Sequence, residues 1–302
     1  MRSRRIKRKM RAAFAGRPRR SKRSLKEYLF AVCVAAVIIL LLTGVWRLVR
    51  PGIRVRASAE TVAAFRVPTG AIDSLRMYAD QNEIKFPELF AVFNAENKFF
   101  PEKHSAYDLS ALERIYVSDF NKLLRRYNSR SIAPYIAMFE NLFGEIEAFP
   151  IPAEWLDGEV IFGDSWGVEH NFQGKDMHRG TAIIDRENIR GRVPIVSMTR
   201  GNVREAGFDA NLGYFVRIVT ENGTHYLYAH LDSIAADIVA GRNVSPGDPL
   251  GVMGNSGGGR RNSRGFPVHL HLAISPDVSF TRGTFWINPY PLLRYVENTS
   301  GR

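Results

Sequence analysis

The second half of the chain is broken into short runs of β-type residues separated by Gly, Asn and Asp. Clear runs are 193–197, 214–219, 224–230 and 268–274. Runs of this length, rich in Val, Ile, Tyr and Phe and bounded by turn residues, are typical of strands. We therefore expect an all-β domain over residues 158–297.

One pair of histidines in this region is especially informative. His269 and His271 stand at i and i+2, so on a strand both rings leave the same face, about 7 Å apart. They could share one site, but two surface histidines on an exposed strand face would explain the pair equally well. Taken alone, the pair does not decide between these readings.

The other histidines extend the pattern over the same half of the chain. His230 ends one apolar run and His178 opens another, so imidazoles are offered from three separate positions. This arrangement indicates a zinc site with an adjacent base. His225 lies at an odd offset from His230, so a regular strand points it to the opposite face, and we expect it on the surface.

At the level of motifs, residues 162–290 resemble the lysostaphin-type (LytM-like) zinc metallopeptidase family. The matching pieces follow the family order across about 130 residues. They are Asp164-Ser-Trp-Gly167, His178-Arg-Gly180, 193–201, Tyr226-Leu-Tyr-Ala-His-Leu231, 247–257 and His269-Leu-His271.

The resemblance implies a fold, a site and an activity. The fold would be an antiparallel sheet groove of the duplicated-hybrid-motif type, and the substrate a peptidoglycan peptide. By position, His178 and His271 would be metal ligands for Zn²⁺. His230 and His269 would be the catalytic residues that flank the attacking water and the substrate carbonyl.

One position departs from the family pattern. The family has Asp four residues after the first histidine, where this chain has Ala182. Zinc would then keep two protein ligands, whereas catalytic zinc sites usually have three. The residues considered as replacements are Asp176, Asp185, Glu169 and His170, and the sequence does not choose among them.

Two functions follow from this departure. The chain could be a zinc endopeptidase that hydrolyses peptidoglycan peptides by metal-activated water. Alternatively, it could be a catalytically inactive family member that binds the cell wall or a protein partner in division or sporulation. The four retained histidines favour chemistry, and Ala182 favours binding.

The region before the β domain is predicted to be helical over residues 71–150, with Pro150 and Pro152 marking a boundary. A segment from Leu89 to Pro101 is similar to the helix that carries the catalytic glutamate of lytic transglycosylases, which would be Glu96. Residues 71–149 leave no obvious room for the rest of that fold, so a helical spacer is favoured over a second active site.

The N-terminus holds a charged tail followed by an apolar run. Residues 1–27 carry thirteen of the 42 Lys and Arg residues, and residues 28–46 are uncharged. The run is long enough for a transmembrane helix, with 47–70 as a juxtamembrane linker, although a cleaved signal peptide is a rival reading. These features predict a bacterial cytoplasmic membrane protein of single-pass type, N-terminus inside and β domain outside.

The charge also bears on partners. The net charge of +12 belongs entirely to residues 1–27, because the remaining residues are formally neutral. Nucleic-acid binding by the folded part is therefore not expected. The only cysteine, Cys33, lies in the apolar run, so neither an intrachain disulfide nor a cysteine zinc site is available.

Overall fold

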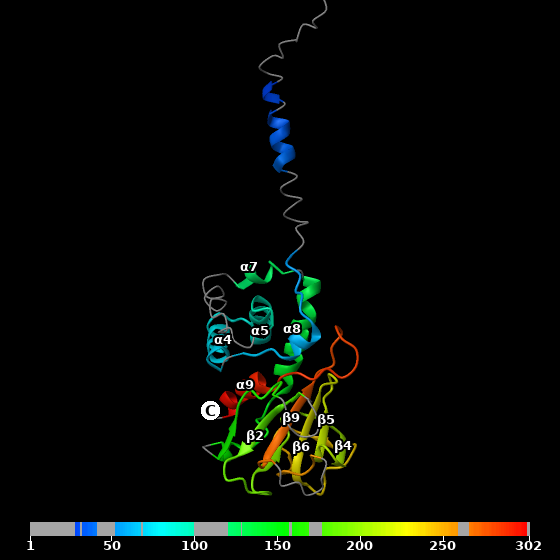
Figure 1. Cartoon of the computed structure of the whole chain (residues 1–302). Helices are drawn as coiled ribbons and strands as arrows, with labels where there is room; N and C mark the ends of the chain where they lie inside the picture. Colours follow the sequence, from blue (N-terminus) through cyan, green and yellow to red (C-terminus); the bar gives the residue numbers. More distant parts are fainter. Residues whose placement is uncertain are drawn as a thin grey trace, which may run out of the picture. The chain divides into compact units, whose positions relative to one another are not determined.

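The computed structural model divides the chain into two units, Met1–Pro51 and Gly52–Arg302. Figure 1 shows the path of the chain. The residues that the structure describes are 28–30, 32–40, 52–67, 69–99, 120–127, 129–156, 159–168, 177–258 and 266–300.

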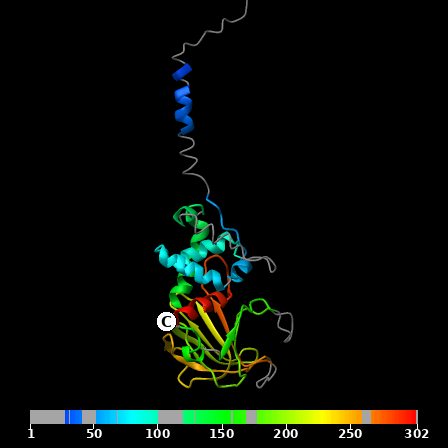
Figure 2. The same cartoon turned by 90° about the vertical axis from the view of Figure 1, so that its left-hand side faces the viewer.

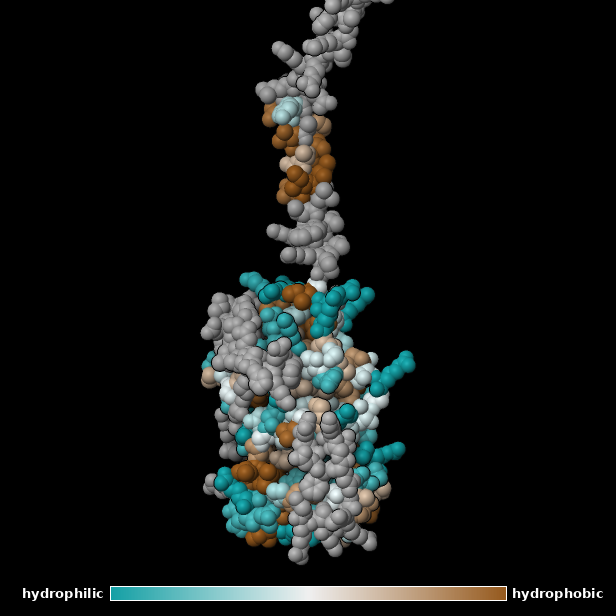
Figure 3. Space-filling view, in the orientation of Figure 1, coloured by the Kyte–Doolittle hydropathy of each residue, from teal (hydrophilic) through white to brown (hydrophobic). Residues whose placement is uncertain are grey.

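The first unit is described only at 28–30 and 32–40, which are helical. Its apolar side chains are exposed, as the brown surface of this segment shows (Figure 3). Among the described residues no helix is long and apolar enough to cross a membrane. The predictions of a transmembrane helix at 28–46 and of a single-pass membrane location are therefore wrong. Residues 31 and 41–46 lie outside the described part.

The second unit begins with a layer of helices. The helix α5 begins at Phe86 with Pro87 in its first turn, where the missing N–H of proline costs nothing. Aromatic rings hold the layer together, because Phe90 lies 4.9 Å from Phe139 and 5.1 Å from Phe143 in edge-to-face contacts. The elements of this layer are α3 (Ala59–Ala63), α4 (Thr69–Gln81), α5 (Phe86–Glu96), α7 (Phe120–Leu124), α8 (Ser129–Glu145) and the 3₁₀ turn η1 (Ala153–Trp155).

These helices pack directly on the β domain. The last helix, α9 (Tyr290–Ser300), lies between the helical layer and the sheet, as both views show (Figures 1 and 2). Its Tyr295 ring contacts Phe86 at 4.8 Å and Phe143 at 4.6 Å. Glu96, the residue singled out by its resemblance to transglycosylases, accepts a hydrogen bond from Tyr127 Oη at 2.5 Å. The helical region is thus docked on the sheet and not a separate spacer.

The sheet confirms the predicted antiparallel all-β fold, since every strand pairing in it is antiparallel. Its main path runs β1-β2-β9-β6-β5-β4-β7, and β8 pairs with both β3 and β6. The strands are β1 (Val160–Phe162), β2 (Thr181–Asp185), β3 (Pro194–Val196), β4 (Gly201–Asp209), β5 (Gly213–Val219), β6 (His225–Ile234), β7 (Asn243–Val244), β8 (Pro249–Met253) and β9 (His269–Ser275).

The two faces of the sheet have different environments. One face joins the helices in a single hydrophobic core that includes Ile183, Tyr226 and Leu270. The other face carries a small apolar cluster of Phe215, Leu227, Ala229 and Ala273, with Trp286 packed against it. Cross-strand partners share a face, and Ala229 pairs with His271 while Leu227 pairs with Ala273. The second face is therefore the one that presents the histidines.

Candidate metal centre and its groove

His178 and His271 meet in the structure although 93 residues separate them. His178 Nε2 and His271 Nδ1 lie 2.8 Å apart and share a hydrogen bond, and the ring centroids are 4.7 Å apart. His271 comes from β9, and His178 comes from the segment just before β2, which pairs with β9. Two ring nitrogens that converge in this way can ligate one metal ion.

The ring of His178 is fixed by its other nitrogen. His178 Nδ1 lies 2.9 Å from the carbonyl oxygen of Ser165, which can only accept, so Nδ1 carries the proton. A neutral His178 then has its lone pair on Nε2, as a metal ligand requires. The loop that supplies this carbonyl is held by Asp164, whose Oδ1 accepts from Trp166 N at 3.1 Å. Burial raises the pKa of Asp164, and Arg66 opposes this shift.

Gly180 makes room for the second ring. A Cβ atom at this position would lie 2.6 Å from the carbonyl oxygen of Leu272 and 2.7 Å from His271 Cε1. Such distances are essentially never seen for real Cβ atoms, so a larger residue would displace β9 or the imidazole. The short sequence His178-Arg-Gly180 thus supplies both one ring and the space for the other.

His230 reaches the same face through a β-bulge. Tyr214 pairs with Leu231 and Val216 pairs with Tyr228, so β6 has one more residue than β5 across this interval. His230 itself has φ +61°, a left-handed conformation that is uncommon outside glycine. Its ring lies 4.9 Å from that of His269 and 5.8 Å from that of His271.

Backbone carbonyls also set the tautomers of the two predicted catalytic histidines. His230 Nδ1 lies 2.8 Å from the carbonyl oxygen of Ser256, and His269 Nδ1 lies 2.8 Å from that of Pro267. Each Nδ1 must donate, so in the neutral rings Nε2 bears the lone pair. The structure therefore brings all four predicted site histidines together, and His225 also lies on their face.

The prediction that His225 lies on the face opposite to His230 is wrong. Its strand neighbour in the ladder is Ser275, in the same alternating row as His271 on β9. Parity placed His225 opposite His230, but the extra residue at the bulge reverses that relation. His225 is half-buried and lines a cavity with Arg217 and Trp286.

Ala182 stands directly beside the metal-ligand pair. It is the register partner of His271, and its backbone N–H donates to Ser165 Oγ at 3.1 Å. Among the described residues no group of three His, Cys, Asp or Glu side chains is placed to hold a metal ion. The described residues therefore offer zinc the two imidazoles of His178 and His271.

Of the four candidate replacements, Asp185 is ruled out by its position. It is 1% exposed on the core face of β2, where it accepts hydrogen bonds from Arg192 and from the Ile189 amide. Burial raises the pKa of Asp185, but these hydrogen bonds outweigh burial and the net shift is downward. The other candidates, Glu169, His170 and Asp176, lie outside the described residues.

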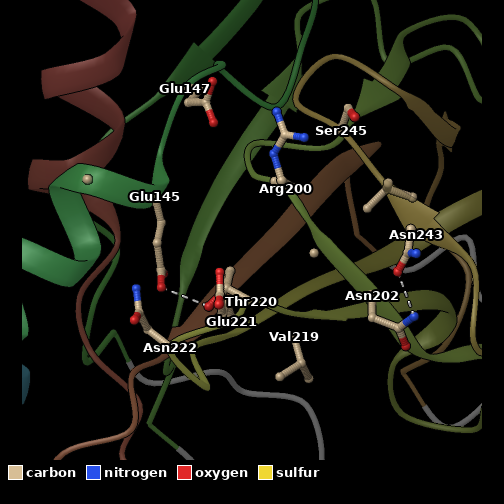
Figure 4. A pocket seen from close by; sticks show the side chains of 13 residues that line it. Glu145, Glu147, Arg200, Asn202, Val219, Thr220, Glu221, Asn222, Asn243 and Ser245 are labelled. Atoms are coloured by element: carbon tan, nitrogen blue, oxygen red, sulfur yellow. Dashed lines mark hydrogen bonds between the residues drawn. The ribbon is translucent and has the colours of Figure 1, made fainter.

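One cavity adjoins the candidate metal pair. A cavity of about 540 Å³ is lined by His178, Arg179, Met177 and Trp286. A different cavity, of about 620 Å³, lies at the opposite end of the strands, where Glu145 accepts from Thr220 and Asn202 donates to Asn243 (Figure 4). None of its described lining residues is a histidine, so this cavity is not part of the candidate metal site.

The sequence did not identify the residues that orient three of the four rings. Ser165, Ser256 and Pro267 act through backbone carbonyls, which any residue type supplies. Phe266 packs against two of the rings, 5.0 Å from His230 and 5.2 Å from His269. The only sequence signal for them was their place inside or beside the family motifs.

The antiparallel sheet and its converging histidines define a domain of the LytM and lysostaphin type. The sequence profile described as Peptidase family M23 matches residues 176–281. A Ruminococcus gnavus protein, described as a glycyl-glycine endopeptidase of the LytM type, is 32% identical with a TM-score of 0.60. The match covers 79% of this chain and 90% of that one. The chain belongs to peptidase family M23.

Curated relatives agree with this family. The L-Ala–D-Glu endopeptidase of Bacillus subtilis (strain 168) is 30% identical over 182 residues, which is 60% of this chain and 49% of that protein. Endolysin 2638A of Staphylococcus phage 2638A is 31% identical over 110 residues, 36% of this chain and 21% of the endolysin. The chain thus spans about half the length of the first relative and about a fifth of the second.

Proposed function

We propose that this chain is a metallopeptidase that hydrolyses a peptide bond in peptidoglycan peptides, with His178 and His271 as metal ligands and His230 and His269 as the catalytic residues. The observation that carries the proposal is the convergence of these four rings on one sheet face. The relative named for an L-Ala–D-Glu bond supports the substrate class. The proposed domain division keeps the helical region at 71–150 and the peptidase-like domain at 158–297.

The roles of the ligands follow from their proton positions. A zinc ion bound at this pair would supply a Lewis acid and lower the pKa of a bound water to about 7. His178 offers Nε2 because its Nδ1 donates to Ser165. When both rings are neutral, the hydrogen bond between His178 and His271 has its proton on His271 Nδ1. Ligation of one metal ion by both rings would therefore require the His271 proton to be on Nε2 instead of Nδ1.

The catalytic pair acts from the neighbouring positions. Neutral His230 has its lone pair on Nε2, which accepts the proton of the attacking water. Protonated at Nε2, His269 donates to the oxygen that becomes negative as the carbonyl is attacked. Their ring centroids are 4.9 Å apart, which suits two groups that act on one reacting centre.

A second function has its own supporting observation. Ala182 occupies the position beside His271 where the family has a carboxylate, so the metal would have fewer ligands. A chain that binds peptidoglycan peptides or a protein partner in the same groove without cleavage would need neither the carboxylate nor the metal. This non-catalytic binding module is the alternative function that we propose.

Incubation of the full chain with purified peptidoglycan and added Zn²⁺ distinguishes the peptidase from the non-catalytic binding module. The peptidase predicts new amino termini, and His178→Gln should lower their release at least about 100-fold because one of two protein ligands is lost. Wild-type chain that sediments with peptidoglycan but releases no termini would leave the binding module as the function. If the chain neither binds peptidoglycan nor releases amino termini from it, both functions are refuted. Circular dichroism of each variant verifies folding.

A further inference from the structure

A continuous row of side chains leads from the metal pair to a second cavity on the same face. Along β9 the row is His269, His271, Ala273 and Ser275, and it has partners at Leu227 and His225 on β6. From His271 to Ser275 the strand covers roughly 14 Å, the length of about four extended peptide residues. The apolar cluster forms the floor between the two ends.

The second cavity differs in character from the apolar floor. It has a volume of about 460 Å³ and shares Trp286 and Thr284 with the cavity beside His178. The two cavities therefore adjoin each other on either side of Trp286. The residues of the second cavity that bear on binding are Arg217, His225, Ser275, Asp277 and Trp286.

Arg217 supplies a cation that the protein compensates weakly. It comes from β5, where its register partners are Glu205 on β4 and Leu227 on β6. Arg217 Nε is 3.9 Å from Glu205 Oε2, too long for a hydrogen bond, and the Glu205 side chain is 58% exposed. Arg217 Nε has no hydrogen-bond partner in the described part of the protein, and the side chain is 27% exposed.

The pKa of His225 depends on the charged groups around this cavity. Burial is the largest cause that lowers the pKa of His225, followed by Arg217 and Arg204, while Asp277 opposes them. The two cations thus outweigh the carboxylate at this position, although Asp277 also lines the cavity. The electrostatic environment at this end of the groove favours an anion.

We propose that the cavity formed by Arg217, His225 and Trp286 binds a free carboxylate of the substrate peptide, about three to four residues from the bond that the catalytic histidines face. This proposal rests on the proposed function and makes it more specific, because it selects an acidic peptide over a neutral glycine-rich one. Arg217 holds the carboxylate, and Trp286 packs against the peptide between the two cavities. Arg217 is accordingly a specificity residue.

The test measures equilibrium binding of the full chain, in EDTA to prevent cleavage, to two synthetic peptides. One is L-Ala-γ-D-Glu-L-Lys-D-Ala with both carboxylates free, and the other has both converted to carboxamides. The wild type should bind the free acid about tenfold more tightly, the equivalent of about 1.4 kcal/mol. Arg217→Gln should abolish this preference, Arg217→Lys should restore part of it, and Arg200→Gln, in the cavity of Figure 4, should leave it unchanged.

The possible results distinguish failure of the carboxylate-binding cavity from failure of the proposed peptidoglycan function. Equal binding of both peptides by the wild type would overturn the carboxylate pocket and leave the peptidoglycan function intact. A preference that survives in Arg217→Gln would overturn the assignment to Arg217, as would an equal loss of affinity for both peptides. Binding of neither peptide would count against the proposed function itself.

Discussion

Replacing Ala182 by Asp tests the metal centre most directly. Ala182 is half-buried and is the register partner of His271, so a carboxylate there would project from the same face as the His271 ring. Structural zinc sites with four ligands bind with about 10–16 kcal/mol, or about 3–4 kcal/mol per ligand. One added ligand should therefore tighten zinc binding by about 100- to 1000-fold.

The assay is a zinc titration of the full chain against a chromophoric chelator, and Ile184→Asp is the matched control. Ile184 lies on the same strand and face but pairs with His269, so its carboxylate adds the same charge away from the metal pair. Only Ala182→Asp should show the large gain. In thermal unfolding, saturating zinc should also raise the Tm of this variant more than that of the wild type.

Two results would refute the reasoning. Equal gains in Ala182→Asp and Ile184→Asp would mean that added charge, and not ligation, attracts the metal. Wild-type chain that already binds one zinc as tightly as Ala182→Asp would mean that another residue completes the site. That result would direct attention to Glu169, His170 and Asp176.

Two further predictions concern the framework of the site. Asp185→Asn should destabilise the fold at pH 7 by about 2–3 kcal/mol, because it leaves the half-buried Arg192 without its buried partner. The folded-state pKa of Asp185 is lowered, so its stabilisation is present above about pH 4 and is lost as the pH falls through that lowered value. Urea unfolding should thus show a smaller difference between variant and wild type at pH 3 than at pH 7, and an unchanged difference would contradict this. Gly180→Ala should cost about 1–3 kcal/mol and weaken zinc binding, since the new Cβ would meet the Leu272 carbonyl and the His271 ring. An unaltered zinc affinity in that variant would show that His271 does not need this space.

Much of the site could be predicted because its chemistry depends on residue types in fixed motifs. The spacing of His269 and His271 requires that both rings leave one strand face, and the structure shows them there. The meeting of His178 with His271 came from the family resemblance, because strand pairing over 93 residues is not encoded in any local pattern. The departure from the family pattern at Ala182 was likewise an expectation from that resemblance.

The errors have physical causes that the sequence does not reveal. His225 was assigned to the wrong face because parity assumes an unbroken strand, and the bulge at His230 adds one residue. No glycine marks that bulge. It is held by tertiary contacts, with the His230 amide donating to the Leu212 carbonyl at 2.8 Å and the ring donating to Ser256. The membrane prediction is contradicted because no helix in the described part of the chain is long and apolar enough to cross a membrane.

The way the rings are held explains how Ala182 is compatible with an otherwise intact site. Carbonyl oxygens of Ser165, Ser256 and Pro267 orient three of the imidazoles, and the fourth, His271, is held by strand pairing and by His178. None of these contacts needs a carboxylate at position 182. The backbone amide of Ala182 has its own partner, because it donates to Ser165 Oγ. The geometry of the groove is therefore independent of a carboxylate at this position, so placing Asp at position 182 should change metal affinity without rebuilding the fold.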